Sequence, residues 1–186
     1  EGYVATRSGA GTKTDTPIIE TPQSVSVVTA DQIRDQKAGS LVDALAYTPG
    51  VSAQSQNFSR MADDIMIRGF NSSSTDGSMM RDGMKYQSNV YDGSQEPYGL
   101  ERLDVLRGAS SMLYGALTPG GAINGVSKRP TDTPLHEINL EYGSYDRKQA
   151  SGDFSGALDK DGTLLYRLTG LVRDADNWVD DVPDDK

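Results

Sequence analysis

The sequence predicts a small α+β domain that reaches to about residue 130 and a set of antiparallel β-strands beyond it. In the first part, short β-branched runs alternate with capped helical segments and long polar loops. After Pro130, apolar and polar residues alternate over long stretches with tight turns between them. No apolar run approaches the roughly 18 residues that a membrane-spanning helix needs, which excludes a helical membrane protein.

Two helices of the first part are predicted from their start signals. Thr29 follows the β-branched strand 24–28 and has Gln32 three residues later, which together form a capping box. Ser40 caps a second helix in which apolar residues recur at i, i+3 and i+4. Pro49-Gly50 ends this second helix.

The strands of the first part are short and end at glycines or turns. One strand covers residues 65–68, and Asp82-Gly83 is typical of the two-residue turn of a β-hairpin. Leu103–Leu106 and Ile123–Ser127 supply two more strands, and Gly120-Gly121 allows the bend before the last of them. Polar loops over 52–64, 71–78 and 87–96 separate these elements, and Asp63 and Asp64 are expected to be loop charges.

Three alternating segments follow Pro130, around Ile138–Tyr142, Lys148–Leu158 and Leu164–Leu171. Strands of about 9–11 residues with one apolar and one polar face are typical of a transmembrane β-barrel. An antiparallel meander on a soluble core gives the same alternation, so the pattern leaves both readings open. Three strands cannot close a barrel, because the smallest membrane barrels have about eight.

Composition excludes several function classes. The net charge is −9, which argues against a nucleic-acid-binding protein, and there is no cysteine for a disulfide or thiolate zinc site. His136 is the sole histidine, so a histidine-based catalytic triad or metal site is not expected, and no cofactor is predicted. Residues 1–15 are rich in small polar residues and are expected to form an extended, mobile arm. No signal peptide precedes Glu1, which fits a cytoplasmic chain or a processed form.

Several motifs occur in a fixed order along the chain: Thr21-Pro22-Gln23-Ser24, then Tyr47-Thr48-Pro49-Gly50-Val51, Ile67-Arg68-Gly69-Phe70, Leu103–Gly108 and Val126-Ser127-Lys128-Arg129-Pro130. Together they closely resemble TonB-dependent outer-membrane ferric-siderophore receptors, most of all those of the hydroxamate type such as ferrichrome receptors. The resemblance runs from Gly11 to Gly170. It favours a processed or trimmed chain over a cytoplasmic one.

The resemblance implies a fold and a location. Residues 16–130 are expected to be an α+β plug with a four-stranded mixed sheet. Residues 131–186 are expected to be about the first three strands of an antiparallel barrel, which has 22 strands in the family. The protein is then expected in the outer membrane of a Gram-negative bacterium, with the plug in the barrel lumen and lipid around the barrel.

The resemblance also implies a function without enzymatic activity. The implied partners are a ferric siderophore, which brings the only iron, and TonB, through a recognition box expected upstream of this chain. Receptors for haem, cobalamin or an oligosaccharide remain an alternative within the same superfamily. A soluble hydrolase using paired carboxylates and a standalone periplasmic binding module are alternatives from other classes.

Three loop apices are the implied ligand contacts, since binding residues lie disproportionately on loops. Tyr91 is the first candidate, because the matching tyrosine of ferrichrome receptors is retained and offers both an aromatic face and a hydroxyl. A neutral Gln56 stands where relatives carry an arginine, and Arg60 in the same loop is a candidate to supply that charge. The remaining candidates are Ser74, Thr75 and Val90.

Arg68 and Arg107 each end a short strand just before a glycine. In relatives the matching arginines pair with glutamates of the barrel and hold the plug in the lumen. Arginine suits this role because its guanidinium binds carboxylates bidentately and keeps its charge when buried. In an isolated plug both arginines are expected to lack partners.

Overall fold

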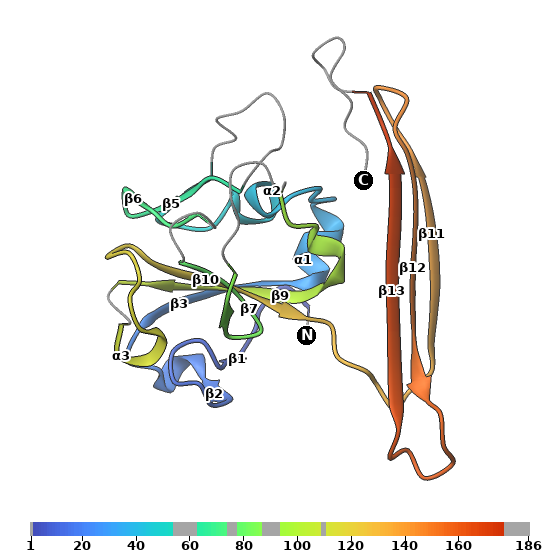
Figure 1. The fold of residues 1–186 in the computed structure, drawn as a ribbon, viewed down its shortest axis with the longest axis horizontal. Coiled ribbons are helices and arrows are strands. Elements are labelled where there is room, and N and C mark those ends of the chain that lie inside the picture. The colour runs from blue at the N-terminus through green and yellow to red at the C-terminus, as the bar shows by residue number, and fades with distance from the viewer. Residues whose placement is uncertain (1, 54–62, 74–77, 87–93, 109–110, 177–186) are drawn as a thin grey trace. The chain divides into compact units, whose positions relative to one another are not determined.

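The structure is a computed structural model that describes residues 2–53, 63–73, 78–86, 94–108 and 111–176. The chain forms two compact units, residues 1–127 and residues 128–186, and each is described by itself (Figure 1). No helix among the described residues is long and apolar enough to cross a membrane.

A five-stranded mixed sheet is the centre of the first unit. Its strands, in spatial order, are β3 (Ser24–Thr29), β9 (Leu100–Arg107), β10 (Gly121–Ser127), β7 (Met79–Arg81) and β8 (Met84–Lys85). β10 and β7 run parallel, and the other neighbours are antiparallel. The predicted mixed sheet is confirmed, with one strand more than the four expected. The hairpin predicted around Asp82-Gly83 is confirmed as β7 and β8, and both turn residues adopt positive φ, as a type I′ turn requires.

Two capped helices cover this sheet, α1 (Ala30–Asp35) and α2 (Leu41–Leu45). The predicted capping box at Thr29 is present, since its side chain accepts the N–H of Gln32 while the Gln32 side chain accepts the N–H of Thr29. The predicted Ser40 cap is confirmed as well. The helices bury apolar side chains against β9 and β10 in one core, which includes Ile33, Leu41, Leu45, Leu103, Val105 and Ile123.

Smaller elements complete the first unit. A second sheet joins β4 (Val51–Ala53), β5 (Ile65–Ile67) and β6 (Phe70–Asn71), of which only β5 was predicted. Ile65 and Ile67 of β5 point into the core. The other short elements are β1 (Arg7–Ser8), β2 (Thr16–Pro17), η1 (Ile18–Glu20), η3 (Pro97–Gly99) and α3 (Ser111–Tyr114).

The composition of the N-terminal arm predicted an extended segment, but the arm folds back onto the first unit. β1 pairs with β2, which folds the arm back into a hairpin. The Thr29 hydroxyl donates to the carbonyl of Gly2 at 2.7 Å, and the Tyr3 hydroxyl donates to the carboxylate of Asp35. The Tyr114 hydroxyl donates to the carbonyl of Ala10 at 2.7 Å. Contacts with distant residues therefore hold a segment that has no apolar period of its own.

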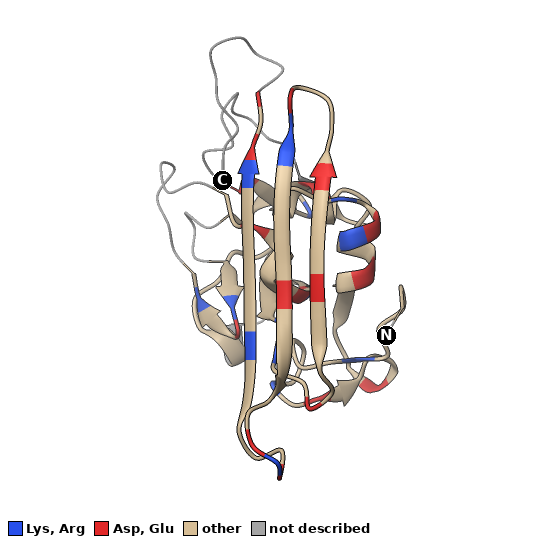
Figure 2. Ribbon diagram, turned by 90° about the vertical axis from the view of Figure 1, so that its right-hand side faces the viewer, with Lys and Arg blue, Asp and Glu red and all other residues tan. Residues whose placement is uncertain are grey.

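The second unit is a three-stranded antiparallel meander of β11 (Leu135–Tyr142), β12 (Lys148–Ala157) and β13 (Leu165–Asp174). Its two faces differ in polarity and exposure, since the apolar face is exposed and the polar face is buried. Large apolar side chains of one face are exposed, with Leu140 at 80% and Val172 at 69%, whereas Ser151, Asp153 and Ser155 of the other face are buried. Figure 2 shows that uncharged residues make up most of each strand.

Asp104, on β9, is a buried carboxylate whose ionisation opposes folding. Its side chain is 1% exposed, and Arg102 on the same face approaches it at 3.3 Å. Burial raises the pKa of Asp104, and the charge of Arg102 only partly offsets this effect. Folding therefore favours the protonated form of Asp104 relative to the unfolded chain.

We expect Asp104→Asn to become progressively more stable than the wild-type chain as the pH rises above about 4, the ordinary pKa of aspartate. Because the folded pKa is raised, the stabilisation by the protonated carboxyl is complete below that pH and is lost as the pH rises. Urea unfolding at several pH values measures the difference. Glu101→Gln, which removes a half-buried carboxylate from the other face of β9, is the matched control. A wild-type chain that gains stability over Asp104→Asn with rising pH would contradict the sign.

Candidate functional site

The six predicted ligand contacts all lie outside the described residues: Gln56, Arg60, Ser74, Thr75, Val90 and Tyr91. The structure does describe the residues at which those three loops begin and end. These loop bases carry buried polar side chains.

Asp63, predicted to be a loop charge, stands outside the strands at the end of the first loop, where it is 1% exposed. Its Oδ2 accepts the backbone N–H of Gln95 at 2.8 Å, and Gln95 follows the third loop. The side-chain amide of Gln95 in turn donates to the Sδ of Met79 at 3.1 Å. Met79 follows the second loop. Two consecutive hydrogen bonds therefore join the bases of all three loops.

Hydroxyl groups fix the second loop to the segment before β10. The Oγ of Ser78 accepts the backbone N–H of Thr118 at 3.0 Å and donates to its Oγ1 at 3.1 Å. Ser72, on the other side of the loop, lies 3.1 Å from the same Thr118 hydroxyl. Ser72 and Ser78 are fully buried. Both ends of the loop are thus held by one threonine.

Arg107 has partners within its own unit, contrary to the prediction. Its Nε donates to the carbonyl of Pro49 at 2.8 Å, and its two terminal nitrogens donate to the hydroxyls of Ser24 at 3.1 Å and Ser26 at 2.7 Å. Burial lowers the pKa of Arg107, and the neighbouring positive charge of Arg68 lowers it further. The side chain thus joins β9, β3 and the turn after α2 through neutral acceptors.

Arg68 presents a different picture, because its side chain is exposed and makes no hydrogen bond or ion pair with the described residues. Its backbone has a φ of 52°, and its N–H donates to the carbonyl of Gly50 at 2.9 Å. A Cβ on Gly108 would lie 3.7 Å from the Nη1 of Arg68, which places the guanidinium beside the end of β9. Among the described residues, Arg107 contacts only neutral acceptors and Arg68 contacts none, so a carboxylate would complement these two cations.

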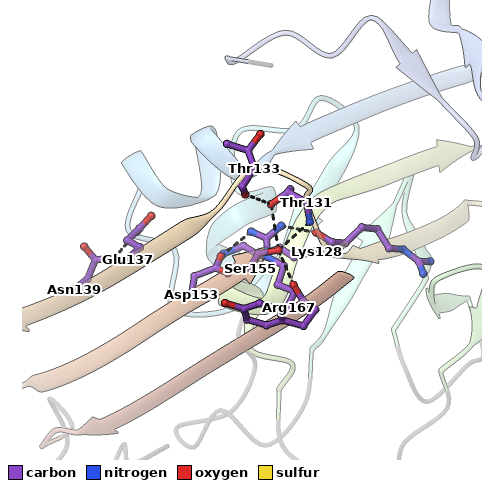
Figure 3. A network of polar contacts seen from close by, with 10 residues as sticks. Lys128, Thr131, Thr133, Glu137, Asn139, Asp153, Ser155 and Arg167 are labelled. Atoms are coloured by element: carbon purple, nitrogen blue, oxygen red, sulfur yellow. Dashed lines mark hydrogen bonds and ion pairs between the residues drawn. The ribbon is translucent and has the colours of Figure 1, made fainter. Parts of the chain in front are cut away.

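A buried ion cluster organises the start of the second unit (Figure 3). The carboxylate of Asp153 receives Lys128 at 2.8 Å and a bidentate Arg167 at 2.8 and 2.9 Å. Arg167 also donates to the carbonyl of Arg129 at 2.7 Å. The backbone N–H of Thr131 donates to the hydroxyl of Ser155 at 2.9 Å. Residues 128–131 are therefore fastened to β12 and β13.

Sequence reasoning had singled out neither Asp63 nor Asp153 as an organising residue. Asp153 falls on the polar face of an alternating strand, which gives it the same pattern as a solvated residue. Asp63 sits between a polar loop and a strand, where nothing in its neighbours marks burial. The burial of each aspartate is explained by a hydrogen-bond partner far along the chain, which the local sequence does not indicate.

Comparisons with known proteins agree with this fold. Residues 17–122 match the family described as the TonB-dependent receptor plug domain. The chain is 46% identical over 172 residues to the ferrichrome outer membrane transporter/phage receptor of Escherichia coli, covering 92% of this chain and 23% of that protein. It is 38% identical over 182 residues to the ferrioxamine receptor of Yersinia enterocolitica, covering 96% and 25%. The chain thus spans about a quarter of the length of these curated relatives.

Solved structures give the same result. The ferric preacinetobactin receptor of Acinetobacter baumannii has a TM-score of 0.83 at 27% identity, covering 97% of this chain and 27% of that one. The ferripyoverdine receptor of the Pseudomonas aeruginosa outer membrane has a TM-score of 0.80 at 26% identity, covering 93% and 23%. The mixed sheet, the two capped helices and the match over residues 17–122 agree. The chain therefore belongs to the TonB-dependent receptor plug domain family.

Proposed function

We propose that this chain is the plug and the first wall strands of an outer-membrane receptor that imports a ferric siderophore with energy from TonB. The observation that carries the proposal is the 46% identity with a ferrichrome transporter over 92% of the chain. The ferrioxamine receptor, at 38%, is also named for a hydroxamate ligand. Iron then arrives only as part of the ligand, and the protein itself needs neither cofactor nor catalytic group.

The meander supports the assignment of residues 131–186 to a barrel wall. Each strand has 8 or 10 residues, close to the length that crosses a bilayer at a tilt. Exposed apolar side chains fall on one face, where hydrocarbon would cover them, and buried polar side chains fall on the other. A soluble meander would bury its apolar face instead. The exposed apolar residues are Ile138, Leu140, Tyr142, Leu168 and Val172.

We infer that the three loops above the bases contribute the ligand site. Tyr91 supplies an aromatic face and a hydroxyl for a ferric hydroxamate. Val90 precedes it in the same loop, and Ser74 and Thr75 belong to the loop before. Gln56 and Arg60 together replace the single arginine of ferrichrome receptors. This exchange favours a hydroxamate whose charge or shape differs from that of ferrichrome.

Arg68 is the proposed contact between plug and barrel wall. Its exposed guanidinium beside Arg107 is unmatched by any carboxylate among the described residues, and barrel glutamates would supply one. Arg107 takes part through its charge, although its own hydrogen bonds are made within the plug.

Binding by the full-length receptor tests the proposal. Purified protein is titrated with ferrichrome, ferric ferrioxamine, a ferric catecholate and haem, and a Kd of about 1 μM or below is expected for at least one ferric hydroxamate. Tyr91→Ala should weaken that binding about tenfold or more, as expected when an aromatic side chain that contacts the ligand is removed. Tyr47→Ala, an exposed tyrosine outside the loops, is the matched control and should bind normally. A receptor that binds haem or the catecholate but neither hydroxamate would overturn the ligand class.

A further inference from the structure

Asp63, Gln95 and Met79 form a buried junction, called the loop junction below. Asp63 directly follows residues 54–62, Gln95 stands two residues after 87–93, and Met79 stands two residues after 74–77. Their side chains are 1%, 7% and 0% exposed, respectively. Each of the three ligand-loop segments is therefore adjacent in sequence to one member of a single bonded group.

The chemistry of the junction is directional. A carboxylate oxygen that accepts a backbone N–H at 2.8 Å fixes both the distance and the angle between two chain segments. The amide-to-sulfur contact at 3.1 Å extends that restraint to the start of β7. Burying a carboxylate is costly, and an apolar side chain would fill the same space without the cost. Core packing alone therefore does not account for an aspartate at this position.

We propose that Asp63 is a positioning residue for the ligand pocket. Its hydrogen bond to Gln95 fixes the distance between the base of the loop that carries Gln56 and Arg60 and the base of the loop that carries Val90 and Tyr91. Through Gln95 and Met79 it relates both to the loop of Ser74 and Thr75. This inference rests on the proposed function, because the loops matter only if they hold a ligand. Asp63 itself touches none in this scheme, so its effect is on the geometry of residues that do.

Calorimetric titration of the full-length receptor with its best ferric hydroxamate separates positioning from stability. A displaced loop raises Kd while every molecule still binds, whereas an irreversibly misfolded fraction lowers the stoichiometry. A plug that unfolds reversibly raises the apparent Kd of every ligand by the same factor, so the ratio of two ligands separates it from a displaced loop. Asp63→Ala should raise Kd about tenfold, the effect of losing roughly one buried hydrogen bond, at unchanged stoichiometry. Asp63→Asn keeps an acceptor oxygen and should bind within about threefold of wild type. Asp64→Ala, the less buried neighbour, is the matched control and should bind as wild type does.

A second readout uses two hydroxamates of different size. Displaced loops change the ratio of their Kd values, which a uniform loss of folded protein does not. If Asp63→Ala fails to fold, Gln95→Leu decides the matter, because it retains the backbone N–H and removes only the contact with Met79. It should change the same ratio.

Unchanged Kd values and ratios in the folded variants overturn the role of Asp63 while the proposed function stands. A wild-type receptor that binds no ferric hydroxamate overturns both.

Discussion

Replacing Gly121 by alanine is expected to prevent the first unit from folding. A Cβ at this position would lie 1.9 Å from the carbonyl oxygen of Leu106 and 2.9 Å from its carbon, both backbone atoms of the neighbouring strand. The residue also has a φ of 132°, which side chains rarely adopt. Backbone strain of this kind costs about 1–3 kcal/mol, and separating β9 from β10 adds the loss of central sheet pairing. Domains are stable by only about 5–15 kcal/mol, so unfolding is the expected outcome.

Circular dichroism and urea unfolding of the chain measure this effect, and two other glycines serve as controls. Gly83 has a φ of 79° but open space around its Cβ position, so Gly83→Ala isolates the backbone strain. Gly170 has neither a positive φ nor a neighbour within 4 Å, and Gly170→Ala should be close to neutral. The expected order of stability is Gly170→Ala, then Gly83→Ala, then Gly121→Ala. Equal stability of the last two would show that the sheet yields to the clash.

Arg107→Ala is expected to lower the free energy of unfolding by roughly 2–3 kcal/mol. The substitution removes three hydrogen bonds from a charged donor to Pro49, Ser24 and Ser26. The contacts with Pro49 and Ser24 are exposed, so water replaces part of what is lost. Urea unfolding of the chain gives the value. A loss below about 0.5 kcal/mol, which is typical of a surface substitution, would contradict it.

Arg68→Ala is the matched control for this measurement. Its guanidinium makes no bond with the described residues, so the chain should keep its stability when the side chain is removed. In the full-length receptor the same substitution should release the plug toward proteolysis, because there barrel carboxylates are the proposed partners. Equal protease resistance of wild type and variant would remove Arg68 from the plug–barrel contact.

Local chemistry predicted much of this fold. Thr29 and Ser40 mark helix starts because their side chains bond to the backbone within three residues. Such contacts can be predicted from the local sequence alone. Asp82-Gly83 is equally local, since positive φ at both positions selects these residue types. The alternation of apolar and polar residues that predicts β11, β12 and β13 repeats every two residues. It can be recognised within each strand without knowing which strand pairs with it.

Elements that depend on distant partners were missed. β4 and β6 have three and two residues, too few for a period, and they exist because β5 lies between them. Asp63 is buried because Gln95, 32 residues later, meets it. The N-terminal arm is held by Asp35 and Tyr114 in the same way. Six proposed ligand contacts lie outside the described residues, so their geometry stays a prediction.

The sheet order has a mechanical consequence. The chain enters the central sheet at Ser24, which pairs with Arg107, and leaves it at Ser127, which pairs with Leu100 at the opposite end. Tension between the segments before Ser24 and after Ser127 therefore loads β3, β9 and β10 in shear, with all their cross-strand bonds sharing the force. The two-residue pairing of β1 with β2 lies between the N-terminus and Ser24, and because these strands form a hairpin, their bonds are loaded one after another. Pulling on the N-terminus should therefore separate β1 from β2 at a lower force than the strands of the central sheet require.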